Sequence, residues 1–469
     1  MKRFEKSILC TLAFLTFLSV CAFSLELSPS FIYQIDTNKY QFTYSFFIGN
    51  DFSQECTINI EIIDFITDGR SYTFDDPGYK YSLRHYVKLN EETMSLDAGE
   101  LKEIFVSFDI PQDFPGATGI VALKISQEGK VGGKIEVRLN YIVPFFVRFS
   151  NIPVYQSINI KGVDMRDLSK DPDERYGRYG TLVTLEIENS GNIAFIPKGN
   201  IQISSKDMRT VITEIPVDSF DLVVFPEKET FYTFYVPFLP PKGTIDFSIY
   251  GQSYGMDFYT SYAFKNDAEN TDSLYSFSQS VILFSEKSRS APTSFDIFNL
   301  SPNKEKITID CDATKFSIVP KTVTIYPYRS ITVMARTYEK DFSFDGDRLY
   351  KVRLLNERNE VIQLANELTL VLRGKSISPS AKASSNIEND ETTLYVENNG
   401  NCVIEVSTFY ENRQLSEESV VLLPSQSTTF IFKQPLRSSQ IQVKYKAFGT
   451  NQEYEIIPTE SIQSGDKSK

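Results

Sequence analysis

The sequence contains a single histidine, His85, and no tryptophan among its 469 residues. A Ser–His–Asp or Cys–His catalytic arrangement would have to use that one imidazole. His85 lies in residues 81–87, a run that is typical of a strand, so we expect a surface or edge-strand residue rather than a catalytic base. The scarcity of histidine therefore predicts that this protein is not an enzyme.

Motifs for metals and cofactors are also missing. No spacing of cysteine and histidine suits zinc, and no glycine-rich loop follows a strand and opens a helix, as nucleotide binding would require. We therefore predict no cofactor. Carboxylates that act together on a glycosidic bond are recognised by their separation in space, so a hydrolase of the cell envelope stays an alternative at this point.

Cysteine is rare, and two of the five cysteines fall within the first 24 residues. The other three, Cys56, Cys311 and Cys402, belong to three different expected domains, and each follows or precedes strand-like residues. A disulfide within one domain is then impossible, and one between domains would need unusual geometry. We predict three buried free thiols that act as small apolar side chains.

No apolar stretch after the amino terminus is long enough to cross a membrane. The amino terminus itself has Lys2, Arg3 and Lys6 before an apolar run over residues 8–20, and Ala22-Phe23-Ser24 then supplies small residues for cleavage before Leu25. These features predict a secretory signal over residues 1–24 and an exported protein of the periplasm or cell surface. A lipoprotein signal with Cys21 as the lipidated residue is the alternative.

The chain has fewer basic than acidic residues. The formal net charge of the whole chain is −13, and removal of residues 1–24, with three basic residues and one glutamate, makes it −15. Nucleic-acid binding needs clusters of Lys and Arg that neutralise phosphates, and no such cluster is present. We therefore expect no nucleic-acid partner.

One pattern recurs four times in the chain. A short apolar run ends in a turn, several mostly polar residues follow, and an alternating strand begins. The four turns, at Ala98, Pro226, Pro327 and Pro424, are 128, 101 and 97 residues apart, close to the size of one immunoglobulin-like sandwich. Strict alternation in residues 42–46, 58–62, 182–187 and 368–372 supports strands, so the fold class is predicted as all-β, with four tandem immunoglobulin-like β-sandwich domains after the signal peptide.

The predicted sandwiches occupy residues 25–149, 150–264, 274–375 and 376–460, followed by a polar tail over residues 461–469. A second repeat supports this division, because residues 185–192 and 394–401 both run from an alternating strand into an Asn-x-Gly-Asn turn. Glycine permits a positive φ there and asparagine tolerates one, so a structural β-turn is favoured over a binding loop.

Two loops are candidate sites. Asp164, Asp167, Asp171, Asp173 and Glu174 crowd the expected loop before Leu182, which could chelate calcium. The basic residues interleaved with them favour a solvated loop of mixed charge, so no metal is predicted. Residues 250–262 combine Tyr, Ser, Gly and Gln, as adaptable recognition surfaces do, and make Tyr254 and Tyr259 candidate partner-binding residues; the alternative is a final strand with its turn.

Phe114 is the third candidate partner-binding residue, because it lies on a loop bounded by Pro111 and Pro115. An aromatic ring on such a loop is either pinned to the sandwich or offered to a partner, and prolines on both sides favour pinning.

The first two predicted domains resemble a known family. Residues 67–70, 86–89 and 94–96, and above all the strand and turns over residues 105–116 followed by the strand at residues 119–123, resemble the peptidoglycan-binding domain of WxL-associated bacterial surface proteins. The same elements are loosely similar to periplasmic pilus chaperones. The resemblance implies an envelope or surface protein as partner, with peptidoglycan as a second candidate. The chain departs from the WxL-associated pattern by lacking a carboxy-terminal membrane span with a basic tail.

These observations favour an exported, non-enzymatic scaffold of the cell envelope that holds or adheres to a partner. The alternative is a periplasmic assembly factor that resembles pilus chaperones. A chaperone needs an open groove for a client strand, whereas a scaffold should have covered edges. Because residues 25–264 carry the resemblance, we expect partner recognition there.

Overall fold

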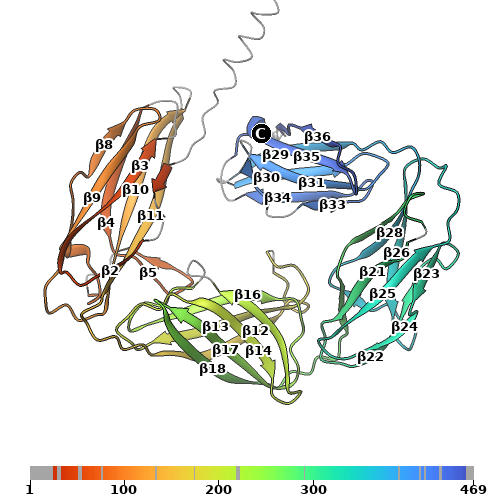
Figure 1. Ribbon diagram of the computed structural model, residues 1–469, viewed down its shortest axis with the longest axis horizontal. Coiled ribbons are helices and arrows are strands. Elements are labelled where there is room, and N and C mark those ends of the chain that lie inside the picture. The colour runs from red at the N-terminus through yellow and green to blue at the C-terminus, as the bar shows by residue number, and fades with distance from the viewer. Residues whose placement is uncertain are drawn as a thin grey trace, which may run out of the picture. The chain divides into compact units, whose positions relative to one another are not determined.

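The computed structural model describes residues 25–28, 33–50, 55–74, 78–131, 135–173, 175–217, 222–289, 291–388, 391–410, 413–416, 419–432 and 436–460. Strands dominate these residues, and the only helical elements among them are two short 3₁₀ turns, η1 (Arg84–Tyr86) and η2 (Ser438–Gln440) (Figure 1). The predicted all-β fold class is confirmed. The expected signal peptide, with Cys21, and the expected tail lie outside the described residues.

The chain forms two compact units. Unit 1 comprises Met1–Arg166, Leu182–Val236 and Gly243–Asn266, and unit 2 comprises Asp167–Thr181, Pro237–Lys242 and Asp267–Lys469. Each unit contains two pairs of facing sheets, which we number sandwiches 1 to 4 in chain order. The described part of the chain includes no helix with the length and hydropathy of a membrane span.

Sandwich 1 consists of two sheets. The first sheet has the order β1 (Leu25–Ser28), β3 (Gln41–Asn50), β9 (Leu101–Asp109), β7 (Val87–Leu89), and the second β2 (Tyr33–Thr37), β11 (Ile135–Phe149), β10 (Thr118–Val131), β4 (Cys56–Ile63), β8 (Thr93–Leu96). Apolar residues alternate along these strands, so one face of each sheet is apolar and must be buried.

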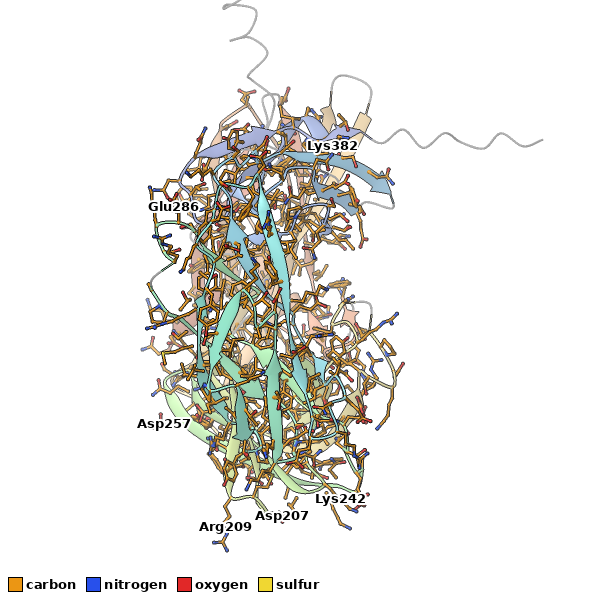
Figure 2. The ribbon with its side chains drawn as sticks, turned by 90° about the vertical axis from the view of Figure 1, so that its right-hand side faces the viewer. Asp207, Arg209, Lys242, Asp257, Glu286 and Lys382 are labelled. Atoms are coloured by element: carbon orange, nitrogen blue, oxygen red, sulfur yellow. The ribbon has the colours of Figure 1, made fainter. Side chains whose placement is uncertain are left out.

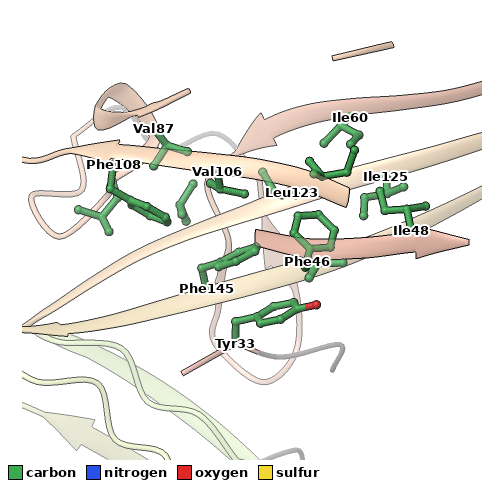
Figure 3. Close-up of a cluster of buried hydrophobic side chains, with 14 of the residues drawn as sticks. Tyr33, Phe46, Ile48, Ile60, Val87, Val106, Phe108, Leu123, Ile125 and Phe145 are labelled. Carbon is green, nitrogen blue, oxygen red and sulfur yellow. The ribbon is translucent and has the colours of Figure 1, made fainter. Parts of the chain in front are cut away.

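The core of sandwich 1 lies between its two sheets. Phe46 and Val106 come from the first sheet and Leu123 and Phe145 from the second, and all four are fully buried (Figure 3). The ring of Tyr33 stacks on Phe145 with centroids 4.7 Å apart. Full burial of such a side chain contributes about 1.5–3 kcal/mol, so this core can stabilise the sandwich without a disulfide.

Sandwich 2 makes up most of the rest of unit 1. Its sheets have the orders β12 (Ile158–Asp167), β13 (Thr181–Asn189), β16 (Lys228–Val236) and β15 (Thr210–Val217), β14 (Lys198–Ser205), β17 (Gly243–Ser253), β18 (Met256–Asn266). Buried residues alternate with partly exposed ones along β13, as expected for a strand with one face in the core. A small hairpin, β5 (Ile66–Thr67) and β6 (Tyr72–Thr73), lies apart from these sheets.

Unit 2 contains sandwiches 3 and 4. Sandwich 3 has the sheets β23 (Phe316–Val319), β25 (Ser330–Thr337), β21 (Thr293–Asn299), β19 (Leu274–Phe277), β27 (Gln363–Leu364) and β20 (Val281–Phe284), β28 (Leu368–Arg373), β26 (Asp347–Leu355), β22 (Glu305–Asp310), β24 (Thr322–Ile325). Sandwich 4 has β34 (Ser427–Phe432), β30 (Glu391–Asn398), β29 (Ala381–Glu388), β37 (Thr459–Glu460) and β32 (Arg413–Gln414), β31 (Ile404–Tyr410), β35 (Ile441–Ala447), β36 (Glu453–Ile456), with β33 (Val420–Leu422) paired to β31.

A buried asparagine ends one strand in each sandwich, and it explains the fourfold sequence pattern. Its side-chain Nδ2 donates a hydrogen bond to a main-chain oxygen at the end of the repeated apolar run. The pairs are Asn50 with Leu96 (2.9 Å), Asn189 with Val224 (3.0 Å), Asn299 with Ile325 (3.2 Å) and Asn398 with Leu422 (3.0 Å). The same contact therefore joins the same two segments in all four sandwiches.

The asparagines also shape the turns that follow them. The Oδ1 atoms of Asn189 and Asn398 accept hydrogen bonds from the backbone N–H groups of Gly191 and Gly400, at 2.9 and 3.0 Å. This accounts for the repeated Asn-x-Gly-Asn turn as a structural element, which is the interpretation that the sequence favoured.

Two local expectations were wrong. Residues 84–86 form the turn η1 instead of continuing a strand, and His85 is exposed on it. The Ser82 hydroxyl accepts the N–H of Arg84 at 3.1 Å, and the N–H of Tyr86 donates to the Leu83 oxygen at 2.8 Å; these local bonds favour a turn over a strand. β12 extends as far as Asp167, so Asp164 and Asp167 lie on a strand and not in the expected loop.

Candidate functional site

One edge of sandwich 1 is the first candidate site. β10 and β11 form a long hairpin, paired from Thr118 with Arg148 to Val131 with Ile135. On the other side of β11, β2 pairs in parallel only with residues Phe145 to Phe149. In the described sheet, residues 135–144 of β11 therefore have β10 as their only neighbouring strand and form a sheet edge about ten residues long.

The sequence of this edge alternates. Ile135, Val137, Leu139, Tyr141 and Val143 are apolar or aromatic at every second position. Among the side chains that the structure describes, Val143 is fully buried and Tyr141 packs against the same core. An edge strand of this length offers backbone N–H and C=O groups to a further strand, and natural proteins protect such edges unless they use them.

The contact between sandwiches 1 and 2 inside unit 1 holds this hairpin in place. We call it junction 1. Its apolar part consists of Ile66, Tyr79, Tyr81, Ile120, Phe146, Ala194, Ile196 and Phe225, all buried. Because Ile120 lies on β10 and Phe146 on β11, the base of the hairpin is packed directly into junction 1.

A tight turn in residues 67–70, part of the segment that carries the family resemblance, belongs to junction 1. The Asp68 carboxylate accepts the N–H groups of Arg70 and Ser71 at 2.9 and 2.7 Å, and these bonds lower the pKa of Asp68. The N–H of Phe231, on β16, donates to the Asp68 main-chain oxygen at 2.7 Å. Gly69 has a φ of 80°, and a Cβ there would meet the Phe231 oxygen at 1.9 Å, so only glycine fits.

Polar contacts complete the rim of junction 1. The Tyr81 hydroxyl donates to Glu227 Oε1 at 3.0 Å, and the Lys80 ammonium lies 2.7 Å from the same oxygen. The hydrogen bond from Lys80, together with that from Tyr81, lowers the pKa of Glu227 against the opposing effect of burial. The guanidinium of Arg70 lies 3.6 Å from the centre of the Phe231 ring.

Tyr254, one of the sequence candidates, is also part of junction 1. Arg148 Nη1 donates to the Tyr254 main-chain oxygen at 3.2 Å, and the Arg148 guanidinium lies 5.7 Å from the Tyr254 ring centre. Tyr254 packs against the apolar cluster of junction 1, and burial raises the pKa of its phenol. These contacts use the ring within unit 1.

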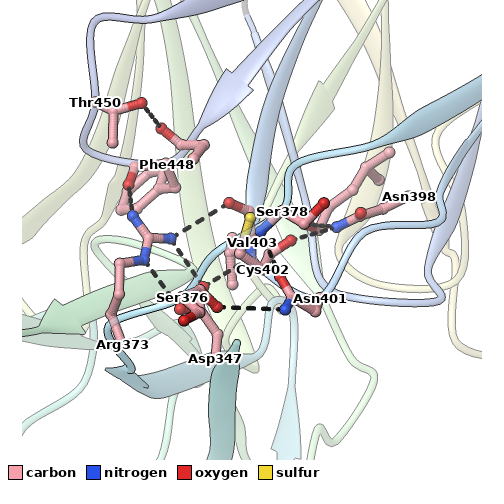
Figure 4. Close-up of polar contacts among 12 residues, drawn as sticks. Asp347, Arg373, Ser376, Ser378, Asn398, Asn401, Cys402, Val403, Phe448 and Thr450 are labelled. Carbon is pink, nitrogen blue, oxygen red and sulfur yellow. Dashed lines mark hydrogen bonds and ion pairs between the residues drawn. The ribbon is translucent and has the colours of Figure 1, made fainter. Parts of the chain in front are cut away.

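Junction 2, between sandwiches 3 and 4 inside unit 2, is built on a buried ion pair. Arg373 Nε and Nη2 lie 2.9 and 2.8 Å from the two carboxylate oxygens of Asp347, whose side chain is fully buried while that of Arg373 is 8% exposed (Figure 4). Arg373 also donates to the main-chain oxygen of Phe448, and Asp347 Oδ2 accepts the N–H of Val403 at 2.8 Å. Both charges on sandwich 3 thus bind the backbone of sandwich 4.

Phe114 and Tyr259 have opposite surroundings. Phe114 is 5% exposed, belongs to the core of sandwich 1 and lies against Phe149 with ring centroids 5.4 Å apart. Its ring is therefore pinned, as the flanking prolines favoured, and offers no surface to a partner. Tyr259 is 67% exposed on β18, at the edge of its sheet.

The acidic candidates that the structure describes do not converge, and Glu174 lies outside the described residues. Asp164 lies on β12, whereas Asp171 and Asp173 belong to the following loop. Burial alone would raise the pKa of Asp167, but hydrogen bonds from the Ser169 hydroxyl and amide and from Lys170 leave it lowered. Among the described residues, no group of three or more His, Cys, Asp or Glu side chains is arranged to hold a metal ion.

The cysteines are poor nucleophiles in this structure. Cys56 and Cys402 are buried, Cys311 is half-buried, and none forms a disulfide. Burial raises the pKa of Cys311 and of Cys402 to about 11, and nearby aspartates add to the effect. A thiol that stays protonated at neutral pH does not attack a substrate.

Sandwich 3 carries a polar cleft of about 820 Å³, lined among others by Lys304, Glu305, Lys306, Arg358 and Glu360. Charges of both signs line it, so it has no clear preference for an anionic or a cationic ligand.

Comparisons with known proteins give only structural matches of low similarity. No protein-family model and no curated protein matches the chain. Solved structures of fimbrial chaperones do match. The class 5 fimbrial chaperone CfaA is 13% identical, with 51% of this chain and 98% of that chain covered and a TM-score of 0.30. A chain of the CsuC–CsuE chaperone–tip subunit complex of Acinetobacter baumannii is 10% identical, with 51% and 97% covered and a TM-score of 0.30.

A further match, the YadV chaperone, is 8% identical, with 51% of this chain and 99% of that chain covered and a TM-score of 0.30. At these values the likeness carries no argument about fold or function. The resemblance to WxL-associated proteins receives no support from these matches, and the residues behind it have structural roles here, as Gly69 in junction 1 illustrates.

Proposed function

We propose that this chain is an exported, non-enzymatic, chaperone-like assembly factor that binds an extended segment of an envelope or surface protein along the edge of β11. The observation that carries the proposal is the limited pairing of β2, which among the described residues leaves positions 135–144 of β11 at the sheet edge. β-strand addition uses such an edge, because main-chain hydrogen bonds supply affinity and alternate side chains supply specificity.

The packing behind the edge supports this function. Ile120 and Phe146 anchor the base of the hairpin in junction 1, so the strand is presented on a rigid support. A preorganised edge loses less conformational entropy on binding than a loose one, which favours affinity. The raised pKa values of the thiols and the exposed position of His85 support a role without catalysis.

The test is hydrogen exchange on the full chain with two synthetic peptides. One peptide alternates apolar and polar residues, and the other has the same composition with the apolar residues in one block. The alternating peptide should slow exchange of backbone amides in residues 135–144, and the block peptide should not. Equal protection by both peptides, or no protection at this edge, would contradict the proposal.

Two adjacent substitutions, Leu139→Pro and Asn140→Pro, supply a control within the strand. Neighbouring N–H groups of a strand point to opposite sides, so one proline removes a bond to β10 and the other removes an edge donor. The variant that loses a bond to β10 should be less stable. The variant that loses an edge donor should keep its stability but lose peptide binding. Retained binding in both variants would also count against the proposal.

A second candidate function is the scaffold, and the two junctions favour it. Each unit has its two sandwiches fixed by a specific contact, as a protein that holds partners at a set geometry requires. On this proposal the module boundaries fall after residues 149, 264 and 375. A partner captured from an envelope extract would then stay bound in the presence of the alternating peptide, whereas a client strand would be displaced.

A further inference from the structure

The outer face of one sheet in sandwich 2 combines tyrosine, amide and hydroxyl side chains on neighbouring strands. The register of β14, β17 and β18 places Asn200 opposite Tyr250, and Tyr250 opposite Tyr259, in one row across three strands. The neighbouring row brings Gln202, Ser248 and Ser261 together in the same way. The two tyrosines, the two amides and the exposed hydroxyl of Ser261 form a continuous patch, which we call the tyrosine face, while Ser248 is buried.

The aromatic part of the tyrosine face is open to solvent. Tyr259 is 67% exposed, and its hydroxyl lies 3.4 Å from that of Ser248. Tyr250 is half-buried beside it. Because both rings rise from an antiparallel sheet, they are held at the spacing of neighbouring strands, about 4.8 Å.

The carboxylates around the tyrosine face are already occupied. Glu214 accepts a hydrogen bond from Gln202 at 2.7 Å, and Asp257, which projects from the ribbon in Figure 2, accepts one from Gln252 at 2.9 Å. Asp246 pairs with Lys206 at 3.1 Å. The row that contains the tyrosines has no charged side chain on these three strands, and Lys198 lies exposed at one end of the face.

We propose that the tyrosine face binds an uncharged linear polysaccharide. Tyrosine rings pack against the apolar faces of pyranose rings and donate through their hydroxyls, and amides and hydroxyls pair with sugar hydroxyls. The spacing between strands is close to the length of one sugar unit, so successive units can rest on Tyr250 and Tyr259.

Charge complementarity selects this occupant over others. An anionic polymer would need clustered unpaired cations, and the face offers only Lys198. A protein partner would need an apolar centre, whereas the exposed aromatic area is mainly that of Tyr259. The site is separate from the β11 edge, so this inference does not depend on the proposed chaperone function.

The experiment is calorimetric titration of the full chain with hexasaccharides of glucose, N-acetylglucosamine, mannose and xylose in β-1,4 linkage, and with an alginate hexamer as the anionic probe. At least one neutral hexasaccharide should bind and the alginate should not. Tyr259→Ala should weaken that binding at least about tenfold, and Asn200→Ala should weaken it by a smaller factor.

The matched control is Tyr338→Ala, which removes a ring that is 59% exposed on sandwich 3 and should leave binding unchanged. Thermal unfolding of each variant verifies that it folds. The proposal is overturned if no neutral hexasaccharide binds, if only alginate binds, or if Tyr338→Ala and Tyr259→Ala have equal effects.

Discussion

The two junctions achieve the same result by different physical means. Junction 1 buries eight side chains with apolar surface and places its charged pair, Lys80 with Glu227, at a rim where both side chains are 50% exposed. Junction 2 buries a small cluster of three valines, Val281, Val371 and Val403, and adds an ion pair that is almost fully buried. Apolar burial distributes stability over many contacts, whereas the buried pair concentrates it in one.

The difference predicts how each junction fails. An exposed ion pair contributes about 0–1 kcal/mol because water and salt screen it. Removal of one partner from a buried pair leaves an uncompensated charge and costs about 3–5 kcal/mol. Junction 1 should therefore tolerate loss of its charges, and junction 2 should not.

The largest effect is expected for Asp347→Ala, which leaves the buried Arg373 without its carboxylate. The local free energy of opening at junction 2 should fall by about 3–5 kcal/mol. Hydrogen exchange of the residue 347 amide, which donates to the Asn401 main-chain oxygen at 2.8 Å across the junction, measures this opening.

Asp310→Ala is the matched control, because Asp310 and Arg353 also lie close, at 2.6 Å, but the arginine side chain is 61% exposed. Its effect should stay below about 1 kcal/mol. Equal losses in the two variants would show that burial of the pair at junction 2 is not what stabilises it.

Gly69→Ala should have the next largest effect, at junction 1. A Cβ at Gly69 meets the Phe231 oxygen, whereas a Cβ at Gly99, which has a similar φ of 74°, meets nothing within 4 Å. Gly99→Ala therefore measures backbone strain alone, about 1–2 kcal/mol, and Gly69→Ala should cost about 2 kcal/mol more. Hydrogen exchange of the Phe231 amide in the two variants measures the difference between their free-energy costs. Equal costs would mean that the contact of Gly69 with Phe231 does not stabilise junction 1.

Glu227→Gln should have a small effect that depends on pH. The pKa of Glu227 is lowered in the folded protein from its ordinary value of 4.5, mainly by the Lys80 hydrogen bond, so the ionised carboxylate stabilises the fold above that value. This contribution, below about 1 kcal/mol, is lost as pH falls through the lowered pKa. The stability difference between wild type and variant should therefore be largest near pH 7 and vanish in acid. A stability difference that grows as the pH falls would contradict a lowered pKa of Glu227.

The smallest structural perturbation is chemical labelling of the thiols. With a pKa of about 11, Cys402 is ionised to about one part in a thousand at pH 8, so its alkylation in the native protein should be slow and should rise tenfold per pH unit. Peptide mapping should show slow labelling of Cys56 as well, since burial raises its pKa, and fast labelling of both in urea. Rapid native labelling of Cys402 but not Cys56 would mean that sandwich 4 opens more readily than sandwich 1.

Two of the four asparagines that make the repeated strand-end contact could be identified from the sequence. Asn189 and Asn398 stand out through their repeated turns, but Asn50 and Asn299 lack the Asn-x-Gly-Asn turn and were missed. Each still follows an alternating strand and precedes the repeated apolar run, and alignment of the four repeats on that run would have found them. The sequence indicated one part of the tyrosine face, within residues 250–262. It did not indicate Asn200 and Gln202, which lie on another strand.

The sequence by itself determined the strictly alternating strands, the all-β fold class and the fourfold repeat, because alternation and turn residues act over a few positions and need no distant partner. Only the tertiary structure decided which surfaces meet. Gly69 lies against Phe231, Tyr81 against Glu227, and Arg373 against the backbone of Phe448, and these partners are far apart in the chain. Contacts of this kind depend on how whole sheets pack, and no local pattern records that.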